Sequence, residues 1–591
     1  DNVTYAQMNA SVNIFIEPAF KELGMDPINV TDITCVAMNY EKKYVVTTIV
    51  PVNHSVNNGW LGFVDPSNQS VFHLMELEDC FLPDHVAVTY SGDIILVSCE
   101  AEPSDNEDED PTYDPAGSVG YIDVSSDNIS DWEYANIGFT DFDIDGKYHD
   151  LLPEDIYYPH EASAFSVNAE PEHIVVDTND TYAYVGLQES NAVAVLDIEG
   201  KEIINVFSFG YGYFGSNGGL DPSDDDDGIN IAEYPNLWSM RQPDDIDFFM
   251  TSSGRKFIFT ANEGDSKKFD ATKVKHLELD EEAFGGANMT DYLKMDEILG
   301  GLKVSNLLGL TVDDTYDDLY MFSSRDFTVF EVCTDADGVP NNISLHFSSD
   351  NDFENITATM IPEGFNSDYT GNSFDSRSDA KGPEPEGLTI GECENGRRFV
   401  FICMERVGGI FAYDFTDIDN ITFADYINNR NFSTTYDDEN MRPPENAGDI
   451  GPEQLRWIPA GSVTNQDEPL LVVSNPQSAS VTMYRIDCGD DPTIPTESMG
   501  VCPIYTTSTT SEGGNSGDTK EETLTTLEIV AIAVGSFAVL SIIVLVTYMM
   551  CKKKKNGIED YKYNSLNEFG NSGGNFSDNR GASGHYFELE K

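Results

Sequence analysis

The sequence has few basic residues. Its 591 residues include 32 lysines and arginines against 105 aspartates and glutamates, which gives a formal net charge of −73 at pH 7. Binding to nucleic acid or to anionic lipid depends on lysine and arginine, so neither is expected as a partner. The excess of carboxylates favours a calcium-rich medium and a cation or a mineral surface as the partner, although an extracellular protein can also be acidic for solubility alone.

The usual patterns of zinc enzymes and of hydrolases are also missing. The nine histidines are scattered without the spacing of a zinc site, and no Ser-His-Asp arrangement stands out. Helical periodicity is scarce, whereas short β-rich runs alternate with turn residues. With 40% hydrophobic and 11% aromatic residues, the sequence predicts a folded all-β protein rather than a disordered chain.

One long hydrophobic run lies near the C-terminal end of the sequence. It extends from Ile529 to Met550, which is enough to span ~30 Å of hydrocarbon, and Lys552–Lys555 follow at once. Lysines mark the cytosolic flank, so we predict a type I protein of the plasma membrane or an endomembrane with its N-terminal side extracellular or lumenal. Residues 551–591 are polar, which argues against a GPI anchor. No signal peptide is visible at Asp1, so we expect a mature form.

Motifs on both sides of the predicted membrane helix fit this orientation. In the tail, Tyr563-Asn-Ser-Leu566 and Tyr586-Phe-Glu-Leu589 resemble the tyrosine-based signals that clathrin adaptors bind, although four-residue motifs also occur by chance. Asn575 matches a glycosylation sequon but is expected to stay unmodified in the cytosol. The predicted N-glycosylation sites of the ectodomain are Asn2, Asn9, Asn29, Asn53, Asn68, Asn128, Asn179, Asn288, Asn342, Asn355, Asn420 and Asn431.

An even number of cysteines in the ectodomain suggests disulfides. Cys393 and Cys403 flank a turn between two strand-like runs, which favours a bond across a hairpin, and Cys488 with Cys502 is the next expected pair. Cys551 at the membrane edge is either palmitoylated or a free thiol. The eight cysteines of the ectodomain are Cys35, Cys80, Cys99, Cys333, Cys393, Cys403, Cys488 and Cys502.

A repeat runs through the ectodomain. Each copy begins with proline and an acid, as in Pro83-Asp84, and continues to a hydrophobic strand that ends in a polar pair, as in Leu187-Gln188-Glu189. A third strand that ends in aspartate often follows. This order of strands is that of a β-propeller blade. With two less regular blades at Ile33–Asp65 and Leu319–Cys333, the sequence predicts about seven blades, or alternatively six.

The chain is therefore expected to divide into five parts. They are an N-terminal segment (1–32), a β-propeller ectodomain (33–490), a stalk rich in Thr, Ser and Pro (491–526), a transmembrane helix (527–550) and a cytoplasmic tail (551–591).

The repeated acids are expected to form rings of carboxylates around the propeller axis, because the innermost strand of each blade lines the central channel. Carboxylates that lie close together raise one another's pKa unless a cation lies between them, and oxygen ligands in such number suit Ca²⁺. Turn chemistry at the start of each blade is the alternative explanation. The predicted ligands are Asp84, Glu100, Glu172, Glu189, Asp244, Glu263, Asp265, Glu384, Glu386, Glu405 and Glu453.

Two acidic loops also resemble calcium sites. Asp141, Asp143 and Asp145 occupy alternate positions before Gly146, which suits the sharp bend of a calcium loop. The glutamate that closes an EF-hand is missing, so a complete EF-hand is not expected. The run Asp224–Gly228 is a less regular example.

The sequence also contains several longer motifs. They include Gly219-Leu-Asp-Pro-Ser-Asp224, Thr260-Ala-Asn-Glu-Gly-Asp265, Ser373-Phe-Asp-Ser-Arg-Ser-Asp379, Lys381-Gly-Pro-Glu-Pro-Glu-Gly387, Glu405-Arg-Val-Gly-Gly409 and Gly448-Asp-Ile-Gly-Pro-Glu453. These motifs resemble those of a known family, the choice-of-anchor I proteins, which include the mesenchyme-specific cell-surface glycoproteins and bacterial secreted proteins labelled alkaline phosphatase or phytase-like. The resemblance implies a phytase-like β-propeller, calcium binding, a surface location and, in the animal branch, a role in biomineralisation. The absence of Asn-Glu-Gly after two of the strands puts a complete carboxylate ring in doubt.

Two hypotheses about function follow. The first is a calcium-binding cell-surface glycoprotein that acts in biomineralisation, matrix contact or ion handling. The second is a calcium-dependent phosphoesterase, in which clustered ions would polarise a phosphate. Its candidate phosphate clamps are Arg325, Arg377, Lys381 and Arg406, since guanidinium and ammonium groups match phosphate oxygens. Pairing of these residues with the abundant acids is their alternative role.

Overall fold

The structure is a computed structural model. It describes residues 19–490, except for 22, 24, 26–27, 69, 104–113, 159–163, 217, 227, 268–269, 435–442, 445 and 463–465, together with residues 492 and 589–590. All of these belong to one compact unit of the chain, made of residues 1–506 and 585–591.

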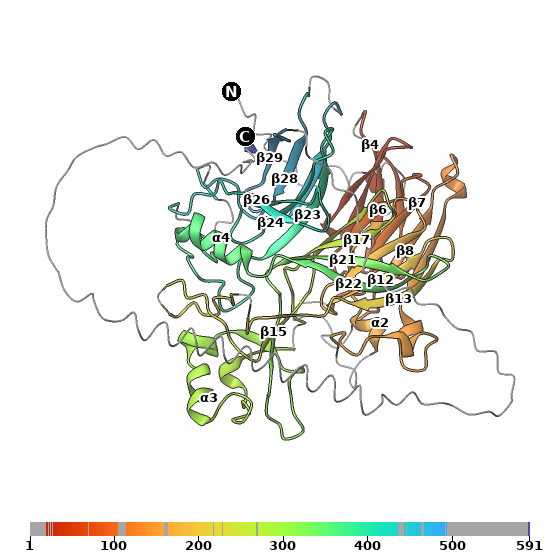
Figure 1. The fold of residues 1–591 in the computed structure, drawn as a ribbon. Helices are drawn as coiled ribbons and strands as arrows, with labels where there is room; N and C mark the ends of the chain where they lie inside the picture. Colours follow the sequence, from red (N-terminus) through yellow and green to blue (C-terminus); the bar gives the residue numbers. More distant parts are fainter. Residues whose placement is uncertain are drawn as a thin grey trace, which may run out of the picture. The chain divides into compact units, whose positions relative to one another are not determined.

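Six sheets of similar design follow one another along the chain, and Figure 1 shows them in order from the red first sheet to the blue sixth. The first sheet contains β1 (Val30–Asp32), β2 (Val36–Asn39), β3 (Tyr44–Pro51), β4 (Trp60–Asp65) and β5 (Ser70–Glu76), and the second contains β6 (Pro83–Val88), β7 (Ile94–Cys99), β8 (Ser118–Asp123) and β9 (Glu133–Gly138). The third sheet contains β10 (Pro171–Val176), β11 (Tyr182–Leu187), β12 (Ala192–Asp197) and β13 (Glu202–Ser208), and the fourth contains β16 (Asp245–Met250), β17 (Lys256–Ala261), β21 (Phe327–Thr334) and β22 (Pro340–Ser348). The fifth sheet contains β23 (Pro385–Glu392), β24 (Arg398–Met404), β25 (Ile410–Asp414) and β26 (Thr422–Ile427), and the sixth contains β27 (Gln454–Ile458), β28 (Leu470–Asn475), β29 (Ser480–Ile486) and β30 (Leu589–Glu590).

A seventh sheet, here called the side sheet, has a different design. It joins β14 (Tyr211–Tyr213), β15 (Leu237–Met240), β20 (Leu319–Met321), β19 (Lys303–Ser305) and β18 (Ala271–Lys273), and its β15 and β20 run parallel. The short helices are α2 (Phe165–Asn168), α3 (Ala287–Leu293) and α4 (Asp352–Met360), with single turns at Ile129–Asp131, Thr140–Phe142, His149–Leu151, Val274–His276, Asp296–Gly300 and Pro362–Gly364.

The prediction of a separate blade at Leu319–Cys333 was wrong. This segment supplies β20 to the side sheet and β21 to the fourth sheet. The reason is that the stretch between β17 and β21 carries three strands of the side sheet, which interrupts the blade pattern in the sequence. The expected blade at Ile33–Asp65 lies within the first sheet.

The hydrophobic cores lie between neighbouring sheets. Leu96 of the second sheet packs with Val185 of the third, and Phe259 of the fourth packs with Phe411 of the fifth. Because the second and third strands of a sheet are covered on both faces, they are almost entirely apolar; β12 reads AVAVLD, and its first five residues are buried. The first strands of successive sheets, β6, β10, β16, β23 and β27, adjoin one another in that order. The architecture is therefore all-β and propeller-like.

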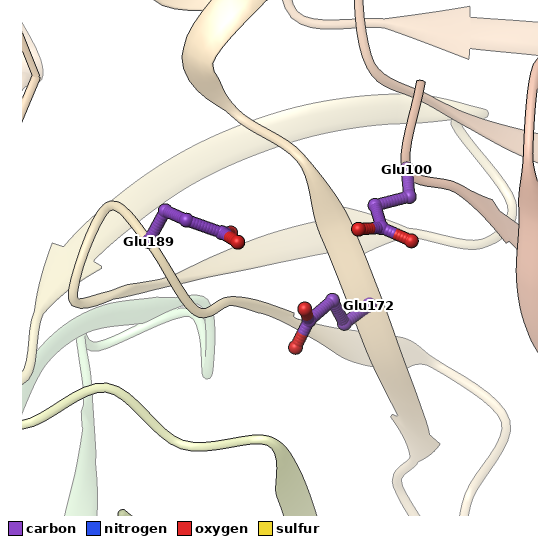
Figure 2. Close-up of side chains that lie close together, drawn as sticks. All are labelled: Glu100, Glu172 and Glu189. Carbon is purple, nitrogen blue, oxygen red and sulfur yellow. The ribbon is translucent and has the colours of Figure 1, made fainter. Parts of the chain in front are cut away.

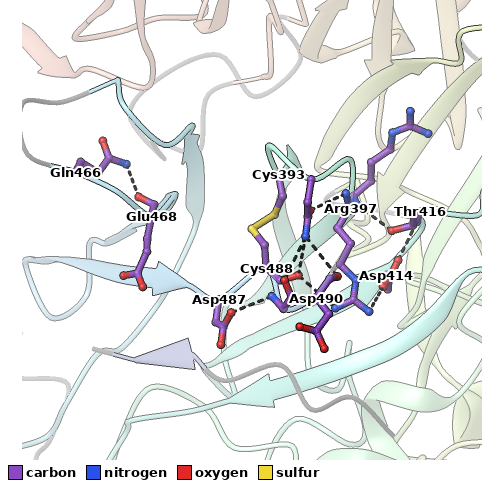
Figure 3. Close-up of a disulfide and its surroundings, with 12 residues drawn as sticks. Cys393, Arg397, Asp414, Thr416, Gln466, Glu468, Asp487, Cys488 and Asp490 are labelled. Carbon is purple, nitrogen blue, oxygen red and sulfur yellow. Dashed lines mark hydrogen bonds and ion pairs between the residues drawn. A yellow bond between two sulfur atoms is a disulfide. The ribbon is translucent and has the colours of Figure 1, made fainter. Parts of the chain in front are cut away.

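Two disulfides are formed among the described residues, and both differ from the expected pairs. Cys80 binds Cys99, and Cys393 binds Cys488, 95 residues away in the sequence. Figure 3 shows this second bond, which ties the turn between β23 and β24 to the end of the sixth sheet. Cys333 is disulfide-bonded as well.

The expected bond between Cys393 and Cys403 was wrong, and so was the bond between Cys488 and Cys502. Cys403 lies near the far end of β24, five residues beyond Arg398 at the start of that strand. Five residues of extended chain span about 17 Å, whereas a disulfide requires Cα atoms about 4.4–6.8 Å apart. Cys403 is a free, buried thiol and Cys35 a free, half-buried one.

No helix in the described part of the chain is long and apolar enough to cross a membrane. The hydrophobic run Ile529–Met550 lies outside that part, as does the stalk apart from Pro492. The predicted motif residues outside it are Asn2, Asn9, Cys502, Cys551, Tyr563, Leu566 and Tyr586. Leu589 lies in β30, which pairs with the edge of β29. The pairing satisfies backbone groups at the edge of the sixth sheet.

Candidate metal centre

Strand register brings the repeated acids to one end of each sheet. Pro83 of β6 lies opposite Cys99 of β7, and Pro171 of β10 lies opposite Leu187 of β11. The acid after each proline and the acid after each second strand therefore leave the hairpin at the same end. Because the first strands of neighbouring sheets adjoin, acids from different sheets meet there.

Three carboxylates from two sheets converge in one group, here called the Glu189 cluster. Glu100 follows β7, Glu172 stands in β10 and Glu189 follows β11, and one oxygen from each lies within 4.8 Å of the others. Figure 2 shows the three side chains pointing toward one another. Ala101, directly after Glu100, has a positive φ of 66°, so the chain turns sharply where the carboxylate leaves the strand.

Burial makes the Glu189 cluster electrostatically costly. Glu189 is only 4% exposed, and its Oε2 atom, like Oε2 of Glu172, is buried without a hydrogen-bond partner. Burial, and then the charges of neighbouring carboxylates, raise the pKa of Glu100 and Glu172 well above the usual value, and burial and Glu170 do the same for the pKa of Glu189. Among the described residues no basic side chain forms an ion pair with these three carboxylates; the Lys267 ammonium binds Glu170 instead, at 2.7 Å.

A second and a third group share Glu263. Asp244, Glu263 and Glu386 form one, and Glu263, Glu384 and Glu405 form the other. We call the first the Glu386 cluster and the second the Glu384 cluster. Glu263 follows β17 in the fourth sheet, whereas Glu386 stands in β23 of the fifth.

Basic residues neutralise the Glu384 cluster. Arg377 Nε donates to Oε1 of the fully buried Glu384 at 2.6 Å. Arg406 Nε lies 3.2 Å from Glu384 Oε2 and equally far from Glu405 Oε2. Lys381 Nζ contacts Glu263 Oε1 and lies 3.7 Å from Glu384 Oε2. This cluster is thus an internal salt-bridge network.

Three other predicted ligands stand apart from these groups. Burial raises the pKa of Asp84 to about 6, and burial together with the charge of Glu405 raises the pKa of Glu453 to about 7. Asp265 lines a small cavity beside Lys381. None of the three belongs to a group of converging ligands in the described part of the chain.

The loop at Asp141–Gly146 does not gather its carboxylates. Asp141, Asp143 and Asp145 form no group of ligand atoms within 4.8 Å, although all three are described. Asp143 instead accepts hydrogen bonds from the backbone N–H and the hydroxyl of Ser166, both at 2.8 Å, and so caps the start of α2. Asp227 of the other acidic loop lies outside the described residues.

Replacing Asp143 with alanine is expected to lower the free energy of unfolding by about 2 kcal/mol, because two hydrogen bonds to a charged group are lost. Calcium affinity should stay unchanged. Thermal unfolding and calorimetric titration of the variant test this, and a weaker Ca²⁺ affinity would contradict the capping role.

The candidate phosphate clamps are all engaged with acids. Arg325 is 2% exposed, and its Nη1 contacts the equally buried Glu354. Nη2 of Arg325 donates to the carbonyl oxygens of Ser378 and Ala380. Arg377, Lys381 and Arg406 belong to the network of the Glu384 cluster. These four residues therefore pair with acids, which is the alternative role considered for them.

Several polar residues that neighbour the predicted ligands were not singled out from the sequence. His85 and His173 stack with their ring centroids 3.7 Å apart, and His173 Nδ1 lies 3.1 Å from Asp245 Oδ1. The repeat could have indicated both histidines, because each of them directly follows a proline-acid pair in the sequence. Glu170 and its partner Lys267 do not belong to the repeated pattern, so nothing in the sequence indicated them.

Most of the predicted glycosylation sites that the structure describes lie at the surface. Of the ten that the structure describes, nine asparagines are exposed, and Asn342 in β22 is half-buried. Glycosylation of these residues remains a prediction that this exposure allows.

A family model described as the choice-of-anchor I domain matches residues 5–418. The chain is similar to a "Mesenchyme-specific cell surface glycoprotein" of Strongylocentrotus purpuratus, with 25% identity over 43% of this chain and 35% of that protein. It is also similar to "Gigasin-3a" of Magallana gigas, with 28% identity over 34% of this chain and 69% of that protein. The match thus spans about a third of the length of the sea-urchin protein.

Among solved structures, the β-propeller domain of Cps50 (Swd1) from Myceliophteria thermophila matches 78% of this chain and 100% of that chain, with 8% identity and a TM-score of 0.30. This score is too low to relate the functions of the two proteins.

Proposed function

The chain belongs to the choice-of-anchor I domain family, and from this premise we propose that it is a cell-surface glycoprotein that binds Ca²⁺ with buried carboxylates at the axis of a six-bladed β-propeller. The six similar sheets are the blades in this proposal. The charge of Asp32, in the first sheet, helps to raise the pKa of Glu453 beside the sixth, which supports closure of the ring.

The Glu189 cluster is the observation that carries the proposal. Unpaired buried carboxylates cost many kcal/mol when ionised, so each must either hold a proton or bind a cation. Two oxygens bound to one Ca²⁺ at about 2.4 Å each can be no more than about 4.8 Å apart. One oxygen each of Glu100, Glu172 and Glu189 meets this limit.

The chemistry of the donors fits Ca²⁺ better than a transition metal. All three ligands are carboxylates, and no histidine or cysteine belongs to the group. Hard oxygen donors select calcium or magnesium, whereas zinc and copper favour nitrogen and sulfur. Buried oxygens without partners, Oε2 of Glu172 and of Glu189, offer further positions in the shell.

Location at the cell surface and contact with mineral complete the proposal. The exposed sequons and the name of the sea-urchin relative support an extracellular ectodomain. A net charge of −73 favours a calcium-rich medium and attraction to a cationic mineral surface. We therefore include biomineralisation, matrix contact or ion handling in the proposed role.

Calorimetric titration of the purified full chain with CaCl₂, after dialysis against EGTA, tests the proposal. We expect a saturable site that releases protons as it binds Ca²⁺, because the raised pKa values leave the ligands partly protonated in the free protein. Proton release would appear as a dependence of the measured enthalpy on the buffer. Association that is weak, non-saturable and independent of the buffer enthalpy would exclude the proposal.

A further inference from the structure

Glu263 stands between two groups of acids and is already held by a cation. Its Oε1 contacts the ammonium of Lys381, and its Oε2 accepts a hydrogen bond from Gln188 Nε2 at 3.1 Å. The Lys381 side chain is 18% exposed. It reaches Glu263 from a loop 118 residues away in the sequence, so the contact depends on the packing of the fourth sheet against the fifth.

We propose that the Lys381 ammonium occupies the place of a second divalent cation, so that the axis binds one Ca²⁺ in the Glu189 cluster and none in the Glu386 cluster. This inference rests on the proposed calcium binding and goes beyond it, because it states what limits the number of ions. Asp244, Glu263 and Glu386 meet the same 4.8 Å limit as the Glu189 cluster. Their ligand geometry alone would admit an ion.

Electrostatics explains why a second ion is excluded. An ion bound beside Glu263 would lie close to the Lys381 ammonium and be repelled by it, and a divalent ion is repelled twice as strongly as a monovalent ion at the same distance. Arg377 and Arg406 add further positive charge on the other side of Glu384. An ion would have to displace Lys381 from Glu263 in order to bind.

The Glu189 cluster differs in this one respect. The nearby Lys267 binds Glu170 at 2.7 Å and forms no ion pair with Glu100, Glu172 or Glu189 among the described residues. The two clusters therefore offer the same type and number of ligands, and direct contact of a ligand with a basic side chain, Lys381 on Glu263, distinguishes them.

Calorimetric titration of full-length variants with CaCl₂ tests the inference. We expect a stoichiometry of about one Ca²⁺ for the wild type, about two for Lys381→Met, and about one for Lys381→Arg, which keeps the positive charge. Lys273→Met is a matched control, because Lys273 binds Asp379 outside the clusters, and it should bind one ion. A second ion in the wild type, or one ion only in Lys381→Met, would overturn the inference.

A second variant keeps the test decisive if Lys381→Met does not fold. Glu386→Gln should keep the stoichiometry and bind Ca²⁺ within about twofold of the wild-type affinity, since the inference places no ion beside Glu386. Loss of an ion in this variant would refute it. Failure of the wild type to bind any Ca²⁺ would instead refute the proposed function, so the two failures are distinguishable.

Discussion

Glu189→Gln is expected to weaken Ca²⁺ binding by about 100-fold, or about 2.7 kcal/mol. The substitution keeps the volume of the side chain but removes one of three converging negative charges. The substitution should also stabilise the calcium-free protein, because the neutral amide relieves repulsion among the buried carboxylates. The melting temperature without Ca²⁺ should therefore rise.

Two measurements separate this outcome from a general structural defect. Thermal unfolding in EGTA should show a more stable variant, whereas unfolding in millimolar Ca²⁺ should show that most of the ligand-induced stabilisation is gone. Glu199→Gln is the matched control, because Glu199 is exposed in the turn between β12 and β13. A variant that melts earlier in EGTA and still binds Ca²⁺ normally would show that Glu189 has only a structural role.

The calcium-free protein should lose stability as the pH rises from about 4 to about 7. Burial raises the pKa of Asp84 to about 6, and burial with neighbouring charges raises the pKa of Asp244 and of Glu453 to about 7. The folded state thus binds more protons than the unfolded state within this window, so the free energy of unfolding falls with increasing pH. One pKa unit corresponds to about 1.4 kcal/mol, so the loss across this window should amount to several kcal/mol.

Calcium should counteract this trend, because the carboxylates of the Glu189 cluster, whose pKa values burial also raises, bind Ca²⁺ in their ionised form and release their protons. Denaturant unfolding at pH 5 and pH 7.5, each in EGTA and in excess Ca²⁺, gives the four free energies of unfolding that must be compared. We expect the stabilisation by Ca²⁺ to be largest at pH 7.5. Equal stabilisation at both pH values, or a calcium-free protein that is more stable at pH 7.5, would contradict the protonation of the axial carboxylates.

Parts of the site could be predicted from the sequence because they depend on local chain geometry. A proline-acid pair before one strand and an acid after the next lie together in any antiparallel hairpin with a short turn. Glu172 and Glu189 illustrate this, since Pro171 pairs with Leu187. Their convergence with Glu100 required only that the second and third sheets be neighbours.

Other features depend on contacts that no local pattern encodes. Cys403 lies at the sequence spacing of a hairpin from Cys393, whereas the actual partner, Cys488, is 95 residues away. The blade pattern of the fourth sheet is interrupted by the strands of the side sheet between β17 and β21. Asp143 was predicted to be a calcium ligand because Ser166, the residue that it caps, lies 23 residues away and could not be identified from local sequence.

The sequence by itself determined that the protein is all-β and repetitive, and that acids recur at equivalent positions, because strand periodicity and turn residues are local properties of the chain. Only the tertiary structure decided which acids are paired with a basic side chain and which are not. Lys381 meets Glu263 across 118 residues, whereas Lys267 binds Glu170 beside the Glu189 cluster. Such pairings depend on how the sheets pack, since the Coulomb energy of a buried pair changes by several kcal/mol over a few ångströms.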